Sequence, residues 1–293
     1  MLSSPAMRGI GKVVVVLLIL TIATFFFFYT RAIKPKRFEP TCPPTPGLVE
    51  GPWRADALDA FFGRHLSADG RFDFAGVRAT PTSEAELDAY LAACAVVSPT
   101  SHPEKFPDPT VAIAYWLRAF DAMSVKTVLL AGPIDDLLDI PVTYSVVEGA
   151  GFFRGRSFVI GGKGTTLHGI ITQSLPKSSR DPRVILAVGG PAKFLLPYAP
   201  TIPVGASQDV WLAARSRAFF DAPGAVTVRG DVVTAPAWLF WRDEWFKRGA
   251  GLDASIDDVF AAAAAFASPE RRADLTPKPG RVFAPQPPDF GLR

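Results

Sequence analysis

The sequence predicts an α+β fold, with helices first, a small mixed sheet in the middle and helices again towards the C-terminal end. Apolar residues recur at helical spacing between about residues 54 and 132, and short strand-like runs replace that pattern between 142 and 188. The chain has 293 residues, 48% of them hydrophobic, which is enough to bury one large core. Because neither an internal repeat nor a second domain boundary interrupts the pattern, residues 54–293 are expected to form one globular domain.

The first half of this domain is expected to hold three helices. Residues 54–66 place their apolar side chains at helical spacing on one face. Ser83 and Glu86 have the spacing of a capping box, which predicts a second helix over 83–97. A third, long helix over 109–132 opens with a proline, a residue that suits the first turn, and ends at a glycine.

The second half is expected to contain strands, a hairpin and further helices. Arg183–Val188 is a near-continuous apolar run, typical of a buried strand. Gly230 lies between two short β-branched runs and predicts a tight hairpin turn. The expected strands are 142–148, 156–162 and 183–188, the hairpin is 226–229 with 232–235, the helices are 208–220, 237–247 and 255–267, and a proline-rich tail follows from 276.

An apolar segment precedes the domain. Residues 13–30 carry no charge, and their length is at the lower end of what spans a bilayer as a helix. A cleaved signal peptide is the alternative, but the end of the segment offers no small-x-small cleavage site. We therefore expect a short tail over 1–12, an uncleaved single-pass anchor over 13–30, and a basic, then proline-rich, stiff linker over 31–53.

Charge is distributed unevenly along the chain. The formal net charge is +3, yet residues 1–37 hold six basic residues and no acidic one, so that residues 38–293 carry about −3. A faintly acidic body without a basic run is unlike a nucleic-acid-binding domain. The basic residues instead flank the apolar segment, which favours a membrane as the partner of residues 13–30.

Motifs of the common chemistries are missing from the sequence. The three histidines and the two cysteines have no metal-ligand spacing, so no metal or cofactor is expected. Cys94 is expected to be a buried structural thiol, and a disulfide between it and Cys42 is left open. The glycine-rich stretch 160–166 fails as a phosphate loop, because Lys163 is followed by Gly164 and not by Ser or Thr. With no Gly-x-Ser-x-Gly elbow either, the residues indicate no particular reaction.

Several short blocks, taken together, resemble one known family. Ala112–Ala122, for example, is similar to that family's hallmark Leu-Ala-Phe-Trp-Ile-Asn-Ala-Tyr-Asn-Ala. The other blocks are Leu58–Phe61, Gly70–Phe74, Leu87–Leu91, Phe152–Phe153, Val159–Gly162, Thr166–Leu167, Asp181–Val188, Trp238–Phe246 and Pro288–Leu292. In order and spacing they resemble domain of unknown function 547 (DUF547), a family found in bacteria and eukaryotes. By this resemblance, residues 54–293 are identified as a divergent member.

The departures from the family pattern concern its polar positions. The two hallmark asparagines fall on Arg118 and Asp121, and the family's histidine falls on Ile185. Its two cysteines fall on Gly189 and Leu196. The resemblance thus implies a kept apolar scaffold in which groups able to attack, donate protons or coordinate are replaced. A thiol-and-imidazole mechanism is not expected at these positions.

A polar pocket with altered chemistry is the remaining candidate site. Arg118 and Asp121 are three residues apart on the predicted helix 109–132 and so share a face. If exposed, such an ion pair contributes under about 1 kcal/mol. If buried, it needs further partners, for which His168 and Arg183 are the candidates. A pocket of these four residues would suit a small anion.

Two main functions follow from this interpretation. The first is a membrane-anchored, non-catalytic binding or scaffolding domain with a degenerate site. The alternative is a membrane-associated hydrolase or transferase with a site rebuilt around Asp121, His168 and Arg183, which would require a cleft that gathers these three. A purely structural membrane protein would instead show an exposed apolar patch. Basic residues around the anchor slightly favour a cytoplasmic body, whereas the family resemblance favours an extracytoplasmic one, which we take as the expected side.

Overall fold

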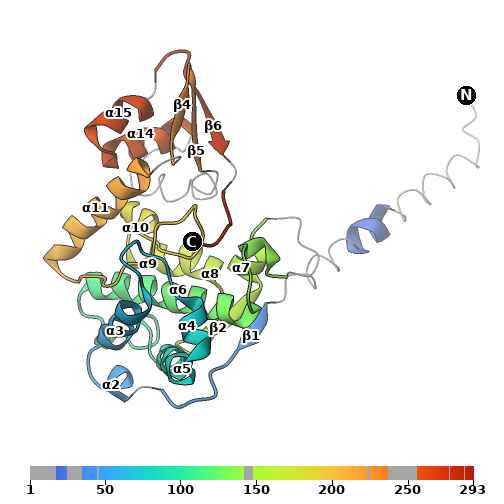
Figure 1. Cartoon of the computed structure of the whole chain (residues 1–293), viewed down its shortest axis with the longest axis vertical. Helices are drawn as coiled ribbons and strands as arrows, with labels where there is room; N and C mark the ends of the chain where they lie inside the picture. The colour runs from blue at the N-terminus through green and yellow to red at the C-terminus, as the bar shows by residue number, and fades with distance from the viewer. Residues whose placement is uncertain are drawn as a thin grey trace, which may run out of the picture.

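The computed structural model describes residues 18–24, 35–44, 46–141, 148–222, 225–236, 256–276, 278–286 and 288–293 (Figure 1). The helices are α2 (Pro46–Val49), α3 (Asp56–His65), α4 (Phe74–Ala79), α5 (Pro81–Val96), α6 (Pro109–Ala131), α7 (Ala150–Arg154), α8 (Leu167–Gly169), α9 (Leu175–Ser178), α10 (Arg183–Leu186), α11 (Ala206–Asp221), α14 (Ile256–Phe266) and α15 (Pro269–Leu275). The strands are β1 (Lys36–Phe38), β2 (Arg156–Ile160), β3 (Lys163–Thr165), β4 (Thr227–Arg229), β5 (Val232–Pro236) and β6 (Val282–Gln286). Short 3₁₀ turns lie at Pro103–Lys105 and Leu137–Asp139, and a π-helical turn at Ile170–Ser174.

The predicted α+β class is confirmed, but the strands form two small sheets rather than one. In the first sheet, β2 pairs in parallel with β1 and antiparallel with β3. In the second, β5 pairs antiparallel with β4 and in parallel with β6. The predicted hairpin is confirmed as β4–β5, with Gly230 at a positive φ of 59° in its turn. The proline-rich tail contributes β6, because a strand at the edge of a sheet tolerates proline.

Helix α6 forms the centre of the core. All its residues from 113 to 129 are buried, and α4, α5, α7, α8 and α9 pack around it (Figure 1). The Asp108 carboxylate accepts a hydrogen bond from the Thr110 amide at 2.8 Å and so caps the first turn. The helix ends at Gly132, whose φ of 88° suits a residue without a Cβ. The predicted helix 109–132 is confirmed.

The other described helices confirm the predicted segments, with one error at a helix start. Helices α3, α5, α11 and α14 lie within or close to the expected ranges. The predicted capping box is wrong, because α5 begins at Pro81, a residue that fits the first turn of a helix. Ser83 instead hydrogen-bonds to the half-buried His65 at 3.1 Å, and Glu86 pairs with Arg64 on α3.

The prediction of a buried strand over 183–188 is wrong. Residues 183–186 form the short helix α10, in which Val184, Ile185 and Leu186 are all buried. The Asp181 carboxylate accepts a hydrogen bond from the Arg183 amide at 2.9 Å, which turns the chain into a helical conformation. A continuous apolar run indicates burial on every side, but it does not distinguish a strand from a buried helical turn.

The expected linker over 31–53 is corrected for its described part, which packs against the body. Lys36–Phe38 forms β1 and pairs with β2, and the Phe38 ring lies 5.3 Å from that of Phe158. Leu48 and Trp53 are buried in the core. Proline-rich composition predicted an extended chain, but Pro46–Val49 forms the helix α2, and the apolar residues between the prolines bury against the body rather than remaining in solvent.

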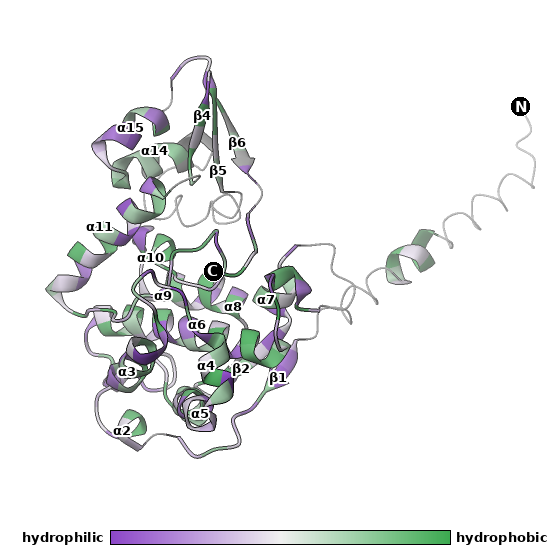
Figure 2. Cartoon of the chain, viewed as in Figure 1, coloured by the Kyte–Doolittle hydropathy of each residue, from purple (hydrophilic) through white to green (hydrophobic). Residues whose placement is uncertain are grey.

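Some predicted segments lie partly or wholly outside the described residues. Of the anchor predicted over 13–30, residues 18–24 are described; they are helical and apolar (Figure 2). Across the described residues, we find no helix with the length and apolar character needed to cross a membrane. The predicted strand over 142–148, except for its last residue, and the predicted helix over 237–247 fall outside the described residues.

Candidate functional site

Arg118 and Asp121 lie together at the centre of the molecule, as predicted from their spacing. The Arg118 side chain is completely buried, with 0% exposure. One terminal nitrogen, Nη1, donates to Asp121 Oδ2 at 3.1 Å and to the Ala199 carbonyl at 2.9 Å. The other, Nη2, donates to the Pro200 carbonyl at 2.8 Å and forms an ion pair with Asp59. We call Asp59, Arg118 and Asp121 the Arg118 cluster.

The surroundings of the Arg118 cluster are apolar, with a second arginine close by. Arg118 lies over the Phe62 ring, 5.1 Å from its centre, and gains a favourable cation–π contact there. Arg215 on α11 donates to the carbonyls of Ala187 at 3.1 Å and Pro197 at 2.8 Å. The hydrogen bonds of Arg118 hold residues 199–200 against α6, and those of Arg215 hold residues 187 and 197 against α11. The two arginines thus connect distant parts of the chain.

Burial dominates the electrostatics of these groups. It raises the pKa of Asp121 to about 6, although the positive charges of Arg118 and Arg215 oppose the shift. Burial also raises the pKa of Asp59, again against the effect of Arg118. For Arg215, burial lowers the pKa to about 10, with Asp121 opposing. Both carboxylates of the cluster therefore hold their protons more tightly than in water.

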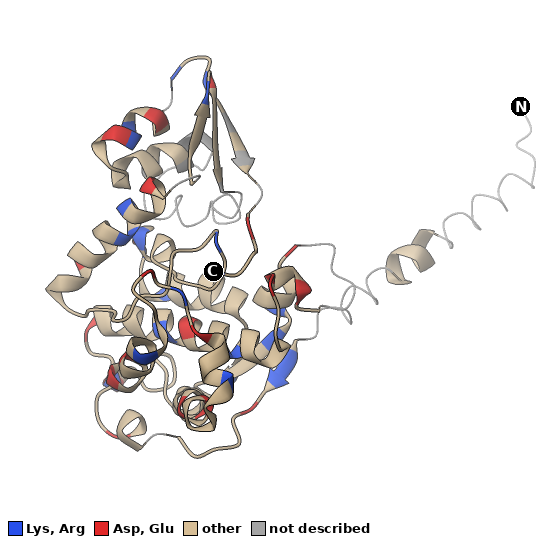
Figure 3. Cartoon of the chain, in the orientation of Figure 1, with Lys and Arg blue, Asp and Glu red and all other residues tan. Residues whose placement is uncertain are grey.

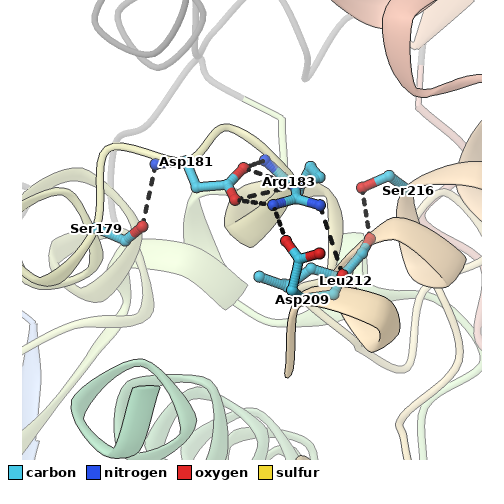
Figure 4. A network of polar contacts seen from close by, with 6 residues as sticks. All are labelled: Ser179, Asp181, Arg183, Asp209, Leu212 and Ser216. Carbon is cyan, nitrogen blue, oxygen red and sulfur yellow. Dashed lines mark hydrogen bonds and ion pairs between the residues drawn. The ribbon is translucent and has the colours of Figure 1, made fainter. Parts of the chain in front are cut away.

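Arg183, the third predicted site residue, belongs to a different group (Figure 4). Its Nε and Nη2 donate to Asp181 Oδ2 at 2.9 and 2.6 Å, and Nη2 also reaches Asp209 Oδ1 at 2.6 Å. These hydrogen bonds raise the pKa of Arg183, those to Asp181 most of all. We call Asp181, Arg183 and Asp209 the Arg183 cluster. It ties the start of α10 to α11.

His168, the fourth predicted site residue, lies on α8. Its Nε2 is 2.8 Å from Nη2 of Arg154, an arrangement in which the ring nitrogen accepts and the guanidinium donates. The Thr172 hydroxyl donates to the His168 carbonyl at 2.8 Å. Among the described residues, neither Arg118 nor Asp121 pairs with His168 or Arg183. The predicted four-residue pocket is therefore corrected: its members occupy three separate places.

Two of the three positions to which the sequence resemblance assigns the family's histidine and cysteines lie side by side. Gly189 forms a β-bridge with Leu196, and Ile185 is fully buried in α10. A Cβ atom at position 189 would lie 3.0 Å from Tyr198 Cα, closer than an ordinary van der Waals contact. Glycine therefore permits the close approach of the two segments here, and a cysteine would require them to separate.

Sequence reasoning missed Asp59 and Arg215. Asp59 lies on the predicted helix 54–66 and Arg215 on the predicted helix 208–220, where each has the pattern of an ordinary surface charge. Only the packing of α3 and α11 around α6 turns them inward. Cys94 is buried as predicted, burial raises its pKa to about 12, and Cys42 and Cys94 are free thiols. No group of His, Cys, Asp and Glu in the described ranges has the make-up of a metal site.

A cleft opens beside this region. A cavity of about 550 Å³ lies between the 193–197 loop, the end of α11 and residues 286–293. A second cavity of about 490 Å³ adjoins it, since Lys193 and Arg293 line both. Leu196, at one of the family's cysteine positions, forms part of the wall of the first.

Comparisons with family models, with characterised proteins and with solved structures find no match to this chain. The resemblance to DUF547 remains a prediction from the sequence.

Proposed function

We propose that this chain is a non-catalytic binding or scaffolding domain with a degenerate site, a divergent DUF547-like domain that residues 13–30 tether to a membrane. The observation that carries the proposal is the complete enclosure of Arg118. Its terminal nitrogens donate to Asp121 and to two backbone carbonyls, and Nη2 also forms an ion pair with Asp59. An arginine bound in this way stabilises the fold and has no terminal N–H group left for a ligand.

The chemistry of the positions that the resemblance assigns to the family's histidine and cysteines supports the same conclusion. Ile185, Gly189 and Leu196 carry no group that attacks a carbonyl or transfers a proton. A rebuilt enzyme site would need Asp121, His168 and Arg183 within reach of one substrate. Instead, the partners of Asp121 and Arg183 belong to separate clusters. No specific observation favours the alternative of a hydrolase or transferase.

The membrane tether rests on sequence. Residues 13–30 are uncharged and flanked by basic residues. The segment that follows, β1, packs on the body through its pairing with β2. A tether at this point would hold the body close to the bilayer, with the extracytoplasmic side as the proposed location.

The test measures both catalytic turnover and ligand binding, on the full chain solubilised in amphipol. Hydrolysis of p-nitrophenyl acetate and p-nitrophenyl phosphate is measured for the wild type, His168→Ala and Arg183→Ala. Lys163→Ala, a change at an exposed strand residue, is the matched control. A thermal-shift screen against metabolites and lipid head groups runs beside it. Saturable stabilisation without turnover is the expected result. Turnover that falls about tenfold or more in His168→Ala or Arg183→Ala, but not in Lys163→Ala, would overturn the proposal.

A further inference from the structure

The cleft beside the 193–197 loop is apolar along its wall and basic at one end. Leu196, Phe219 and Ala222 contribute to the wall of the larger cavity. Lys193 and Arg293 lie where the two cavities meet, and the smaller one is also lined by Arg71 with its ion-pair partner Asp69. From this arrangement we propose that the cleft binds a single-chain anionic amphiphile, with its carboxylate or phosphate head at Lys193 and Arg293 and its alkyl chain along the apolar wall. This proposal rests on the proposed binding function and names its ligand class.

Positive charge at the head-group end is incompletely neutralised. The guanidinium of Arg293 donates to the carbonyls of Lys193 at 2.8 Å and Leu195 at 2.6 Å, and no carboxylate of the described residues pairs with it. Lys193 Nζ is 3.9 Å from Asp289 Oδ2, a loose contact between side chains that are both more than half exposed. An anionic head group would give these two positive charges a carboxylate or phosphate partner.

The dimensions and the remaining polar group also suit a small amphiphile. Ligand pockets have volumes of roughly 300–1,000 Å³, and the larger cavity has about 550 Å³. Gln286 lines the cavity and adds a polar side chain to its wall.

Arg293 stabilises the conformation of the loop that lines the cleft. Its side-chain bonds run to the backbone of the 192–195 turn, and its amide donates to the Pro191 carbonyl at 2.9 Å. These bonds fix the 286–293 segment against the 193–197 loop. Lys193 is therefore the better residue to test, because its charge lines both cavities, while its ion-pair partner among the described residues is Asp289, held only by a loose contact.

Photo-crosslinking tests the proposal on the full chain in amphipol. The probe is a decanoate with a diazirine near the end of its chain, and labelled peptides are identified by mass spectrometry. We expect labelling within 193–197 and 218–225, with competition from decanoate and decyl phosphate but not from decanol or inorganic phosphate. The stronger of the two competing anions identifies the preferred head group.

Three variants locate the site. Lys193→Ala should lower labelling of these peptides about threefold to fivefold, as expected for one partly solvated charge. Ala222→Trp should abolish labelling by filling the cavity. Lys163→Ala, an exposed lysine on β3, is the matched control and should label like the wild type. Far-ultraviolet circular dichroism and melting temperature establish that each variant is folded.

Two results would overturn the proposal. One is labelling confined to residues 13–30, or unchanged in both Lys193→Ala and Ala222→Trp. The other is equal competition by decanol, which would show that charge has no part in binding. In either case the proposed non-catalytic function stands, because its own test depends on turnover and on His168 and Arg183.

Discussion

The Arg118 and Arg183 clusters have the same composition and opposite surroundings. Each places one arginine between two aspartates. The side chain of Arg118 is 0% exposed and that of Asp121 is 4% exposed. Arg183 lies between Asp181 and Asp209 (Figure 4). Its side chain is 21% exposed, and that of Asp209 is 72% exposed. Acidic and basic segments are otherwise interspersed over the described body (Figure 3).

The difference shows that burial, rather than the number of ion pairs, decides how much such a cluster contributes to the stability of the fold. Water replaces the partners of an exposed ion pair almost fully when one side chain is removed. A buried pair that loses one member leaves a charge in a medium that solvates it poorly. Arg118 therefore has a structural role that its partners cannot fulfil without it, whereas Arg183 adds a modest tie between α10 and α11. The following experiments test this contrast, from the largest effect to the smallest.

Arg118→Ala should destabilise the fold by about 3–5 kcal/mol, because the buried Asp121 is left without its cation and the half-buried Asp59 loses its ion-pair partner. Urea denaturation followed by circular dichroism measures the change in the free energy of unfolding. Arg183→Ala in the same assay is the control. A loss below about 1 kcal/mol for Arg118→Ala would contradict the assigned role of burial.

Stability should also depend on the protonation of Asp121. Its folded-state pKa of about 6 lies above its ordinary value of 3.8. The folded form therefore binds the proton more tightly. The stabilisation of the fold by this protonation is fully present below pH 3.8 and is lost as the pH rises to about 6. We expect the wild type to lose about 2–3 kcal/mol relative to Asp121→Asn over that window. A difference between the two proteins that is independent of pH from 4 to 7 would refute the raised pKa.

Lys126 provides an intermediate case. Its side chain is 3% exposed, but its partners Glu84 and Asp88, both at 2.7 Å, are 39% and 23% exposed. Lys126→Ala leaves carboxylates that water can reach. We therefore expect the free energy of unfolding to fall by about 2 kcal/mol, between the losses expected for Arg118→Ala and Arg183→Ala. Denaturation in urea measures it, and Lys163→Ala serves as the exposed-lysine control. A loss as large as that of Arg118→Ala would mean that partner exposure has little influence.

Arg183→Ala should have the smallest effect, at most about 1 kcal/mol. The loss should shrink further at high salt, because exposed ion pairs are screened. Denaturation at low and high ionic strength measures both. A salt-independent loss of several kcal/mol would show that the Arg183 cluster is as tightly enclosed as the Arg118 cluster, and the contrast would disappear.

The order of elements was largely predictable from the sequence. The long helix was bounded by Pro109 and Gly132, and the hairpin by Gly230, because prolines and glycines act locally on the backbone. The nature of the 183–188 run was not predictable, because its apolar residues are buried on all sides in a helical turn as they would be in a strand. Packing of the 36–53 segment also depended on distant partners, such as β2.

For the candidate site, the sequence alone determined that Arg118 and Asp121 share a helical face, since the period of the helix fixes which residues are neighbours. It also determined that Ile185, Gly189 and Leu196 carry no reactive group. Only the tertiary structure decided the partners of the pair, because Asp59, Arg215 and the carbonyls of 199–200 come from segments brought together by burial of the core. The same packing kept His168 and Arg183 apart from the Arg118 cluster and opened the cleft lined by Lys193 and Arg293.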